Sequence, residues 1–162
     1  MSARVRGRLT TLRAAIEDDI ELLVGWHRDP DVSRFWDDEI FTPSEIRERL
    51  EGGDVDAYIV EADGVPIGYA QTWRSDDGRG GGLDMFLIPT ARGVGYGPDA
   101  ARALATYLRD EAGWTEITVD PYLWNEQAIR AWERAGFVRV GERQADDVHS
   151  SSWLMMRFAE PV

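Results

Sequence analysis

The sequence lacks two residue types entirely. With no cysteine among 162 residues, disulfide bonds, a thiol nucleophile and thiolate metal ligands are excluded. Lysine is absent too, so all 18 basic residues are arginine, and Schiff-base catalysis by a lysine amine is excluded. Histidine is scarce, because the sequence has only 2, His27 and His149, which lie far apart. We therefore expect no metal site.

Long hydrophobic runs are missing as well. No apolar stretch approaches the roughly 20 residues of a membrane-spanning helix, and the N-terminal MSARVRGRLTTLRA lacks the apolar segment of a signal peptide. We therefore expect a cytoplasmic protein without a membrane partner. The composition, 43% hydrophobic and 30% charged, is typical of a globular chain. A length of 162 residues suits a single domain, which we predict over residues 1–162.

Basic residues are fewer than acidic ones, 18 against 30. The formal net charge of -12 argues against a nucleic-acid partner, because a phosphate backbone would be repelled. The excess of acid favours a cationic ligand, and it is equally what a solvated acidic surface would produce. Both interpretations stay open on composition alone.

Hydrophobic periodicity and turn signals predict alternating strands and helices. Helices are expected at residues 17–27, 42–53, 98–113 and 125–136. Strands are expected at residues 8–15, in a hairpin over 55–74, and at 83–89, 114–121, 137–144 and 150–158. This order predicts an α/β protein with a mixed sheet flanked by helices.

Local signals sharpen some of these boundaries. Thr42 and Glu45 form a capping-box pattern around Pro43 at a helix start. Asp63-Gly64 is a typical tight-turn pair for the hairpin. The segment 28–41 is expected to be irregular, and SDDGRGGG at 75–82 is expected to be a flexible linker.

A glycine-rich loop, ARGVGYG, lies between a strand that ends at Pro89 and the helix predicted from Pro98. Glycine at every second position lets the main chain approach a ligand closely, and the amides of a helix start attract anions. Arg92 can add a charge-assisted contact to a phosphate. The loop is not a Walker motif, because no Gly-Lys-Ser/Thr follows, and its spacing does not fit a dinucleotide-binding loop. A purely structural turn is the alternative interpretation.

The loop does not stand alone. Through Arg92, Gly95 and Gly97, the stretch LIPTARGVGYG resembles the acyl-CoA-binding motif Arg/Gln-x-x-Gly-x-Gly/Ala of the GNAT N-acetyltransferases. NEQAIRAWERAGF is similar to that family's Asn-x-x-Ala-hydrophobic-x-x-Tyr-x-x-x-Gly-Phe segment. The resemblance implies an α/β (α+β) GNAT fold, with a mixed, mostly antiparallel central sheet flanked by helices. It also implies acetyl-CoA as the bound coenzyme.

Within that family, the chain resembles the aminoglycoside 6'-N-acetyltransferases in YIVEADGVPIGYAQTW, GLDMFL and VDPYLWNEQAIRAWERAGF. The likeness implies an antibiotic-resistance enzyme that acetylates an amine of a small cationic substrate. Two alternatives stay open, because the N-terminal segment is less specific. One is an N-acyltransferase for a protein N-terminus or a siderophore, and the other is a non-catalytic acyl-CoA-binding module. Oligomeric state, monomer or homodimer, is left open.

Two carboxylates are predicted to be catalytic. Acetyl transfer needs a neutral amine, so a base must accept a proton directly or through water. Asp84 heads the strand that leads to the glycine loop, and a buried carboxylate there would be costly without a role. Asp120 ends a neighbouring strand, beyond which ligands tend to bind. Both are also expected to contact the cationic acceptor, and the alternative for Asp120 is a cap on the turn at Pro121.

The resemblance assigns further site residues. Those expected to bind coenzyme A are Phe86, Leu87, Ile88, Arg92, Gly93, Val94, Gly95, Tyr96, Gly97, Asn125 and Trp132. Asn125 also fits a plain helix cap. Trp132 departs from the family's tyrosine, and an indole N–H is too weak an acid to protonate a thiolate. Water or another hydroxyl, such as that of Tyr122, is then the substitute; alternatively no acid is needed, because a thiolate is a tolerable leaving group at neutral pH.

Aromatic and acidic residues are expected at the acceptor side. Beside the two carboxylates, the predicted substrate-binding residues are Trp36, Asp37, Tyr69 and Trp73. Ordinary packing is the alternative interpretation for the aromatic members of this group.

Overall fold

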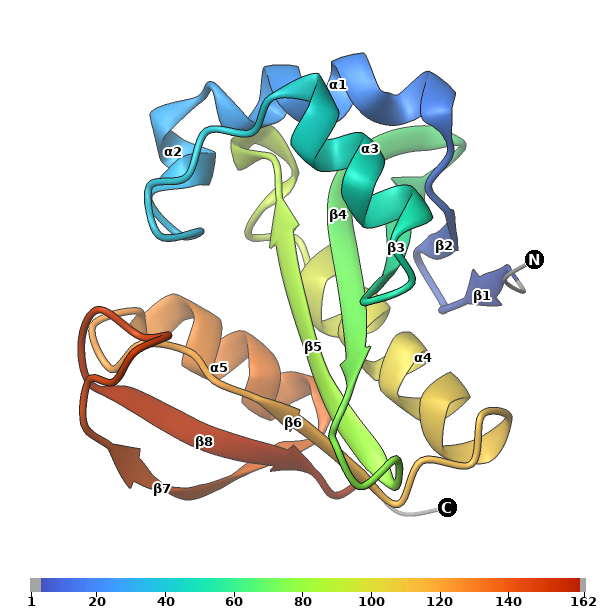
Figure 1. The fold of residues 1–162 in the computed structure, drawn as a ribbon. Coiled ribbons are helices and arrows are strands. Elements are labelled where there is room, and N and C mark those ends of the chain that lie inside the picture. The colour runs from blue at the N-terminus through green and yellow to red at the C-terminus, as the bar shows by residue number, and fades with distance from the viewer. Residues whose placement is uncertain (1–3, 161–162) are drawn as a thin grey trace.

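The computed structural model describes residues 4–160 and shows one eight-stranded sheet with helices on both faces (Figure 1). Across the sheet the strands follow the order β1-β2-β3-β4-β5-β6-β8-β7. Their bounds are β1 (Val5–Arg6), β2 (Thr11–Ala14), β3 (Asp56–Ala62), β4 (Val65–Arg74), β5 (Gly80–Leu87), β6 (Glu116–Val119), β7 (Phe137–Arg143) and β8 (Trp153–Phe158). Neighbouring strands are antiparallel except β5 and β6, which are parallel. The predicted mixed, mostly antiparallel sheet is confirmed.

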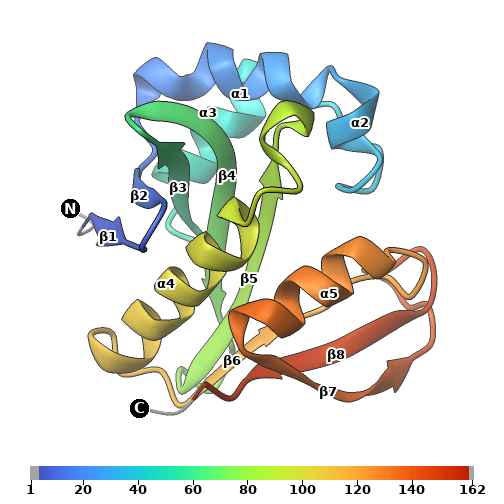
Figure 2. The same ribbon diagram turned by 180° about the vertical axis from the view of Figure 1, so that it is seen from behind.

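The helices divide between the two faces of the sheet (Figures 1 and 2). One face carries α1 (Ile20–His27), α2 (Pro30–Ser33) and α3 (Pro43–Glu51). The other carries α4 (Tyr96–Asp110) and α5 (Glu126–Ala135), and short 3-10 turns, η1 (Glu17–Asp19) and η2 (Pro89–Ala91), precede α1 and α4. Among residues 4–160, no helix is long and apolar enough to cross a membrane.

Alternation along β4 and β5 decides which side chains reach the α1 face. Successive side chains of a strand point to opposite faces of the sheet. In β5, Phe86 packs with the α1 and α3 residues, whereas Leu83 and Leu87 pack with α4. Asp84 is two positions from Phe86 and therefore shares its face, beside its register partner Gln71 on β4. The acid within this apolar strand thus points away from the main core.

The parallel pair β5 and β6 is short. Pairing joins only the segment Gly80–Gly82 to Glu116–Thr118, and beyond it the two strands diverge, as Figure 1 shows. The glycines at this point are packed, since a Cβ at Gly81 would lie 1.8 Å from the main-chain oxygen of Trp73. The prediction of a flexible linker over 75–82 was therefore wrong for its last residues, which are glycine because neighbouring strands approach closely.

Several local predictions can be checked directly. The capping box is confirmed: Glu45 N–H donates to Thr42 Oγ1 at 3.2 Å and Thr42 N–H donates to Glu45 Oε2 at 3.0 Å. The hairpin turn has Asp63 and Gly64 at φ values of 51° and 76°, as a tight turn requires. The segment 28–41 was expected to be irregular, but it contains the short helix α2, which Asp29 caps.

Helix α4 begins at Tyr96, before the predicted start at Pro98. Gly95 precedes it with φ of 94°, a left-handed conformation that favours glycine. Asp99, in the first turn, accepts hydrogen bonds from the main-chain N–H groups of Arg8, Leu9 and Thr10 at 2.9 to 3.0 Å. Its negative charge therefore holds the turn between β1 and β2 against the helix start.

Candidate active site

A cleft of about 420 Å³ opens where β5 and β6 diverge. Of the residues predicted to bind coenzyme A, those that line it are Phe86, Leu87, Arg92, Gly93, Gly95, Gly97, Asn125 and Trp132. Ile88, Val94 and Tyr96 were also predicted, but they are not among the lining side chains: Ile88 and Tyr96 pack against the core, and Val94 is 63% exposed. The structure therefore gathers most of this set around one cavity.

The glycine loop has the geometry of an anion cradle. Gly93 and Gly95 both have positive φ, at 83° and 94°, so the main chain turns tightly before the start of α4. Arg92 pins the loop from within, because its Nε donates to Leu87 O and its Nη2 donates to Asp31 O, both at 2.9 Å. Main-chain amides at a helix start suit phosphate oxygens. The residues present therefore fit the pyrophosphate of an acyl-CoA.

The cleft is basic although the chain is acidic. Its charged lining residues are Arg92, Arg130 and Arg134, in a chain whose formal net charge is -12. Arg130 and Arg134 stand one helical turn apart on α5, so both reach the same side of the cleft. Guanidinium groups bind phosphates well. The local charge thus favours an anionic ligand.

Asn125 and Trp132 occupy α5 at the cleft wall. Asn125 Oδ1 accepts a hydrogen bond from Ala128 N–H at 3.2 Å, so the side chain does cap the helix, and it also lines the cleft. Trp132 packs edge-on against Phe137, with ring centroids 5.3 Å apart. Each residue therefore has a packing or capping contact beside its place at the cleft.

Asp84 lies on β5, two residues beyond Gly82, where the pairing with β6 ends. Its side chain is partly buried on the α1 face. Burial raises the pKa of Asp84 to about 6, and the nearby Asp120 charge adds to the rise. The Gln71 amide, which donates to Asp84 Oδ2 at 3.1 Å, and the Arg49 charge oppose it. A carboxyl with a pKa near 6 is largely ionised at neutral pH yet basic enough to accept a proton, which suits a general base.

Asp120 follows β6 and pairs with a histidine. His149 Nε2 lies 2.6 Å from Asp120 Oδ2, while His149 Nδ1 lies 2.8 Å from Asp146 Oδ1. The imidazole stacks on Trp153, whose Nε1 donates to Asp146 Oδ2 at 3.2 Å. Burial would lower the pKa of His149, but the two carboxylates outweigh it and raise that pKa above its usual value. The imidazole therefore orients the Asp120 carboxylate.

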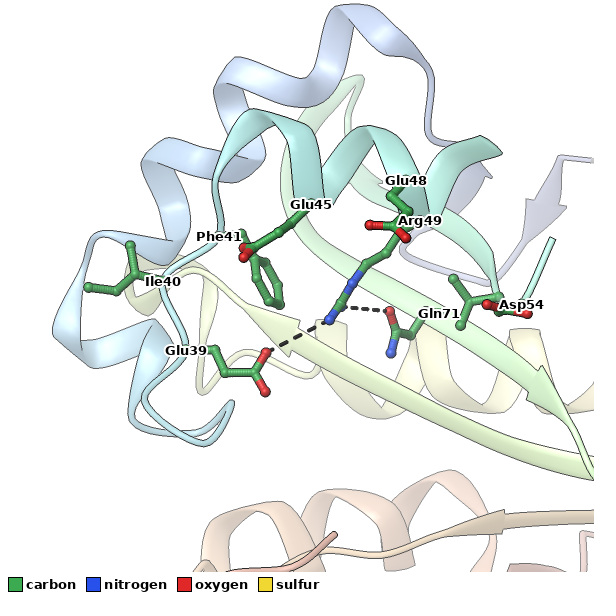
Figure 3. A pocket seen from close by; sticks show the side chains of 9 residues that line it. Glu39, Ile40, Phe41, Glu45, Glu48, Arg49, Asp54 and Gln71 are labelled. Carbon is green, nitrogen blue, oxygen red and sulfur yellow. Dashed lines mark hydrogen bonds and ion pairs between the residues drawn. The ribbon is translucent and has the colours of Figure 1, made fainter. Parts of the chain in front are cut away.

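A second cavity, of about 560 Å³, lies on the α3 side of β4 (Figure 3). Its charged lining residues are Glu39, Glu45, Glu48, Asp54 and one cation, Arg49. Gln71 also lines this cavity and donates to Asp84, so the acidic pocket ends one side chain away from the carboxyl. An acidic cavity near a carboxyl of raised pKa suits a cationic amine.

The predicted acceptor residues have different surroundings. Trp36 packs edge-on against Tyr69 and Phe86, with centroids 5.9 and 5.6 Å apart. Tyr69 is buried, and its hydroxyl donates to Gln71 Oε1 at 2.9 Å. These two aromatic side chains therefore pack beside Gln71 and Phe86, next to Asp84 on the α1 face of the sheet.

Asp37, Trp73 and Tyr122 are more open. Trp73 is 38% exposed and covers Gly82, where β5 and β6 begin to part. Tyr122, considered as a substitute acid, donates its hydroxyl hydrogen to Asp37 Oδ1. That donor is already used, so the geometry does not favour Tyr122 as the proton source for a thiolate.

Sequence reasoning missed two arginines of the cleft, Arg130 and Arg134. It also missed three polar residues near Asp84 and Asp120, namely Arg49, Gln71 and His149. Gln71 could have been found, because it lies between Tyr69 and Trp73 on the same face of one strand. Arg49 and His149 carried no usable signal. Arg49 is a helix position with ordinary spacing, and His149 follows a mixed segment, QADDV, that has no clear periodicity.

These features together are those of an acyl-CoA-dependent transferase: a glycine loop at a helix start that suits an anion, a basic cleft near the point where two strands diverge, and a carboxyl of raised pKa close to it. The comparisons with known proteins agree. Residues 15–145 match the family model described as an acetyltransferase (GNAT) domain. The chain therefore belongs to the GNAT acetyltransferase family, which confirms the family, fold and enzyme class predicted from the sequence.

Individual relatives narrow the comparison. The chain is 32% identical over 150 residues to aminoglycoside N(6')-acetyltransferase type 1 of Klebsiella pneumoniae, covering 81% of this chain and 75% of that protein. The solved structure of AAC(6')-Ib in complex with paromomycin and acetyl-CoA is similar with a TM-score of 0.82 and 29% identity, over 93% of both chains. A spermidine N-acetyltransferase from Vibrio cholerae, 17% identical with a TM-score of 0.80 over 93% of this chain and 95% of that chain, shares the fold.

Proposed function

We propose that this protein is an aminoglycoside 6'-N-acetyltransferase that uses acetyl-CoA as its acetyl donor. The observation that carries the proposal is the position of Asp84 between a basic cleft and an acidic pocket, with a pKa of about 6. Support comes from the relative in Klebsiella pneumoniae, which acetylates aminoglycosides by name, and from a solved neighbour that holds acetyl-CoA.

The donor side rests on the cleft. The glycine loop and Arg92, Arg130 and Arg134 would hold the phosphates of the coenzyme. Pairing of β5 with β6 ends at Gly82, so the following main-chain groups on that side of β5 can take the pantetheine arm in place of a strand. A main-chain N–H of β5 would then polarise the thioester carbonyl.

The chemistry follows from the proton balance. The acceptor arrives as an ammonium ion, which is not nucleophilic, and Asp84 takes its proton directly or through one water. The amine nitrogen then forms a bond to the carbonyl carbon, and the carbon–sulfur bond breaks to release the thiolate. The nitrogen still carries one proton too many for an amide, and it loses that proton to water. Because a thiolate is stable near neutral pH, water suffices to protonate it, and Trp132 need not act as an acid. Asp120, held by His149, supplies a counter-charge to the acceptor.

The test is a turnover assay with defined acceptors. Purified protein is incubated with acetyl-CoA and kanamycin or ribostamycin, and free coenzyme A and the acetylated product are measured. We expect turnover that depends on a 6' amine, so an aminoglycoside with a hydroxyl at that carbon should serve as an unreactive control. If peptides with a free N-terminus or siderophore hydroxylamines react and aminoglycosides do not, the acceptor assignment is wrong. Tight coenzyme binding with no turnover on any amine would instead indicate a binding module.

Two broader predictions accompany this proposal. The cytoplasmic location and a monomeric or homodimeric state are expectations from the sequence. Light scattering coupled to size-exclusion chromatography measures the oligomeric state directly. Fractionation of cells that express the protein measures its location.

A further inference from the structure

Among residues 4–160, Arg49 is the one positive side chain that lines the acidic pocket (Figure 3). Its Nη2 lies 3.8 Å from Glu39 Oε2, and its Nη1 donates to Gln71 Oε1 at 3.3 Å. The guanidinium carbon sits 4.1 Å from the centroid of the Phe41 ring. An acid, an amide and an aromatic face therefore hold this cation in place.

The contacts of Arg49 continue to the proposed base. Gln71, which accepts from Arg49, is buried and donates through Nε2 to Asp84 Oδ2 at 3.1 Å. Tyr69 fixes the same amide, because its hydroxyl donates to Gln71 Oε1 at 2.9 Å. The Arg49 guanidinium is thus separated from the Asp84 carboxylate by one buried amide whose orientation is determined.

A neighbouring arginine on α3 shows what an ordinary surface pair looks like. Arg47 pairs with Glu17 at 3.2 Å, and the two side chains are 44% and 68% exposed. Such solvated pairs contribute little to structure or binding. Arg49 is more enclosed, at 29%, and lies in a cavity of about 560 Å³. The two arginines therefore form a matched pair for experiment.

We propose that Arg49 is a specificity-determining residue that occupies the place of one acceptor ammonium group in the acidic pocket. This inference rests on the proposed function, because it takes the pocket as the acceptor site. The guanidinium offsets the charge of Glu39 and repels a second cation at short range. An acceptor with an extra amine near the reacting one therefore gains no affinity from these acids, although the pocket is acidic overall.

Two kanamycins test this directly, since they differ only in a hydroxyl or an amine at the 2' carbon of the sugar that carries the 6' amine. Both groups belong to one ring, so the 2' group lies within a ring's width of the reacting nitrogen. KM and Kd are measured for both, on the protein loaded with coenzyme A for the Kd. For the wild type we expect similar values for the two compounds.

Removal of the Arg49 charge should give the protein a preference for the kanamycin with the 2' amine. In Arg49→Gln, KM and Kd for the 2'-amine compound should fall about three- to tenfold relative to the 2'-hydroxyl compound, as one uncovered charge pair near the surface would give. Arg49→Lys keeps the charge and should retain the wild-type ratio. Arg47→Gln, on the same helix, should also retain it, and thermal unfolding confirms that each variant is folded.

The possible results distinguish the role of Arg49 from the proposed function. An unchanged ratio in Arg49→Gln, with normal turnover by the wild type, would overturn this inference alone. A ratio that shifts equally in Arg47→Gln would also overturn it, because the effect would then come from net charge. If the wild type neither binds nor acetylates either kanamycin, the proposed function and this inference both fail.

Discussion

The two cavities of this protein differ in charge although both lie close to Asp84, which is hydrogen-bonded to Gln71 of the pocket and precedes Met85 of the cleft. The cleft between β5 and α5 is lined by Arg92, Arg130 and Arg134, whereas the pocket beside α3 is lined by four acids and one arginine. The net charge of the whole chain, -12, agrees in sign with the pocket but not with the cleft. Charge is therefore sorted by position, with basic side chains around one cavity and mostly acidic side chains around the other.

The difference has a simple physical basis. The proposed donor carries phosphates and the proposed acceptor carries ammonium groups, so each needs a surface of opposite sign. Placed together in one cavity, the two sets of side chains would neutralise each other and lose their selectivity. Gln71 links Arg49 of the pocket to Asp84 without adding charge, because it accepts a hydrogen bond from the one and donates a hydrogen bond to the other.

The largest expected effect comes from removing the Asp84 carboxyl. Asp84→Asn should lower kcat by about two to four orders of magnitude, as loss of a general base does. Binding of acetyl-CoA should stay close to the wild-type value, because Asp84 is not among the cleft-lining side chains. Steady-state kinetics with calorimetric titration of coenzyme A measures both, and an unchanged kcat would remove Asp84 as the base.

Asp84→Asn should also raise the free energy of unfolding at alkaline pH. The folded-state pKa of Asp84 is about 6, above the ordinary 3.8, so the folded state binds this proton more tightly than the unfolded state. The contribution of Asp84 to stability therefore falls as pH rises through this window, by about 3 kcal/mol once pH exceeds 6. Denaturant unfolding should show Asp84→Asn more stable than wild type at pH 8, with the difference shrinking towards pH 4. A difference that does not depend on pH would contradict this.

Loss of His149 should lower the catalytic efficiency with the acceptor. In His149→Gln we expect kcat/KM for kanamycin to fall about tenfold, since the Asp120 carboxylate loses a charge-assisted partner. The raised pKa of His149 means that its stabilising pairs are fully present below its unfolded pKa and are lost as pH rises through the folded one. The difference in melting temperature between wild type and variant should therefore be largest under mildly acidic conditions. Equal melting temperatures at every pH would show that the pairs do not form.

The smallest effect is expected at the donor side. Arg130→Gln should weaken coenzyme A binding about three- to tenfold, because one of several arginines that line the cleft is lost. The Kd of the acceptor should not change. Arg139→Gln is the matched control, since Arg139 is an exposed residue of β7 that pairs with Glu133. Equal losses in both variants would mean that net charge, and not the cleft, sets the affinity.

Much of the fold could be predicted from local signals. The capping box at Thr42, the turn at Asp63-Gly64 and the alternating apolar residues of β4 act over a few neighbouring residues, so they can be interpreted without knowing the rest of the chain. The linker prediction failed because the glycines before Leu83 are explained only by close contact with other strands. Such contacts are not encoded in local spacing.

The sequence by itself determined the family, the glycine loop before a helix and the presence of an acid, Asp84, within an apolar strand. These depend on residue types at fixed spacing along one segment. Only the tertiary structure placed Arg49 and Gln71 next to that acid, and brought His149 to Asp120 from 29 residues away. The raised pKa of Asp84 and the opposite charges of the two cavities depend on burial and distance. Both are properties of packing between segments, which a linear pattern does not contain.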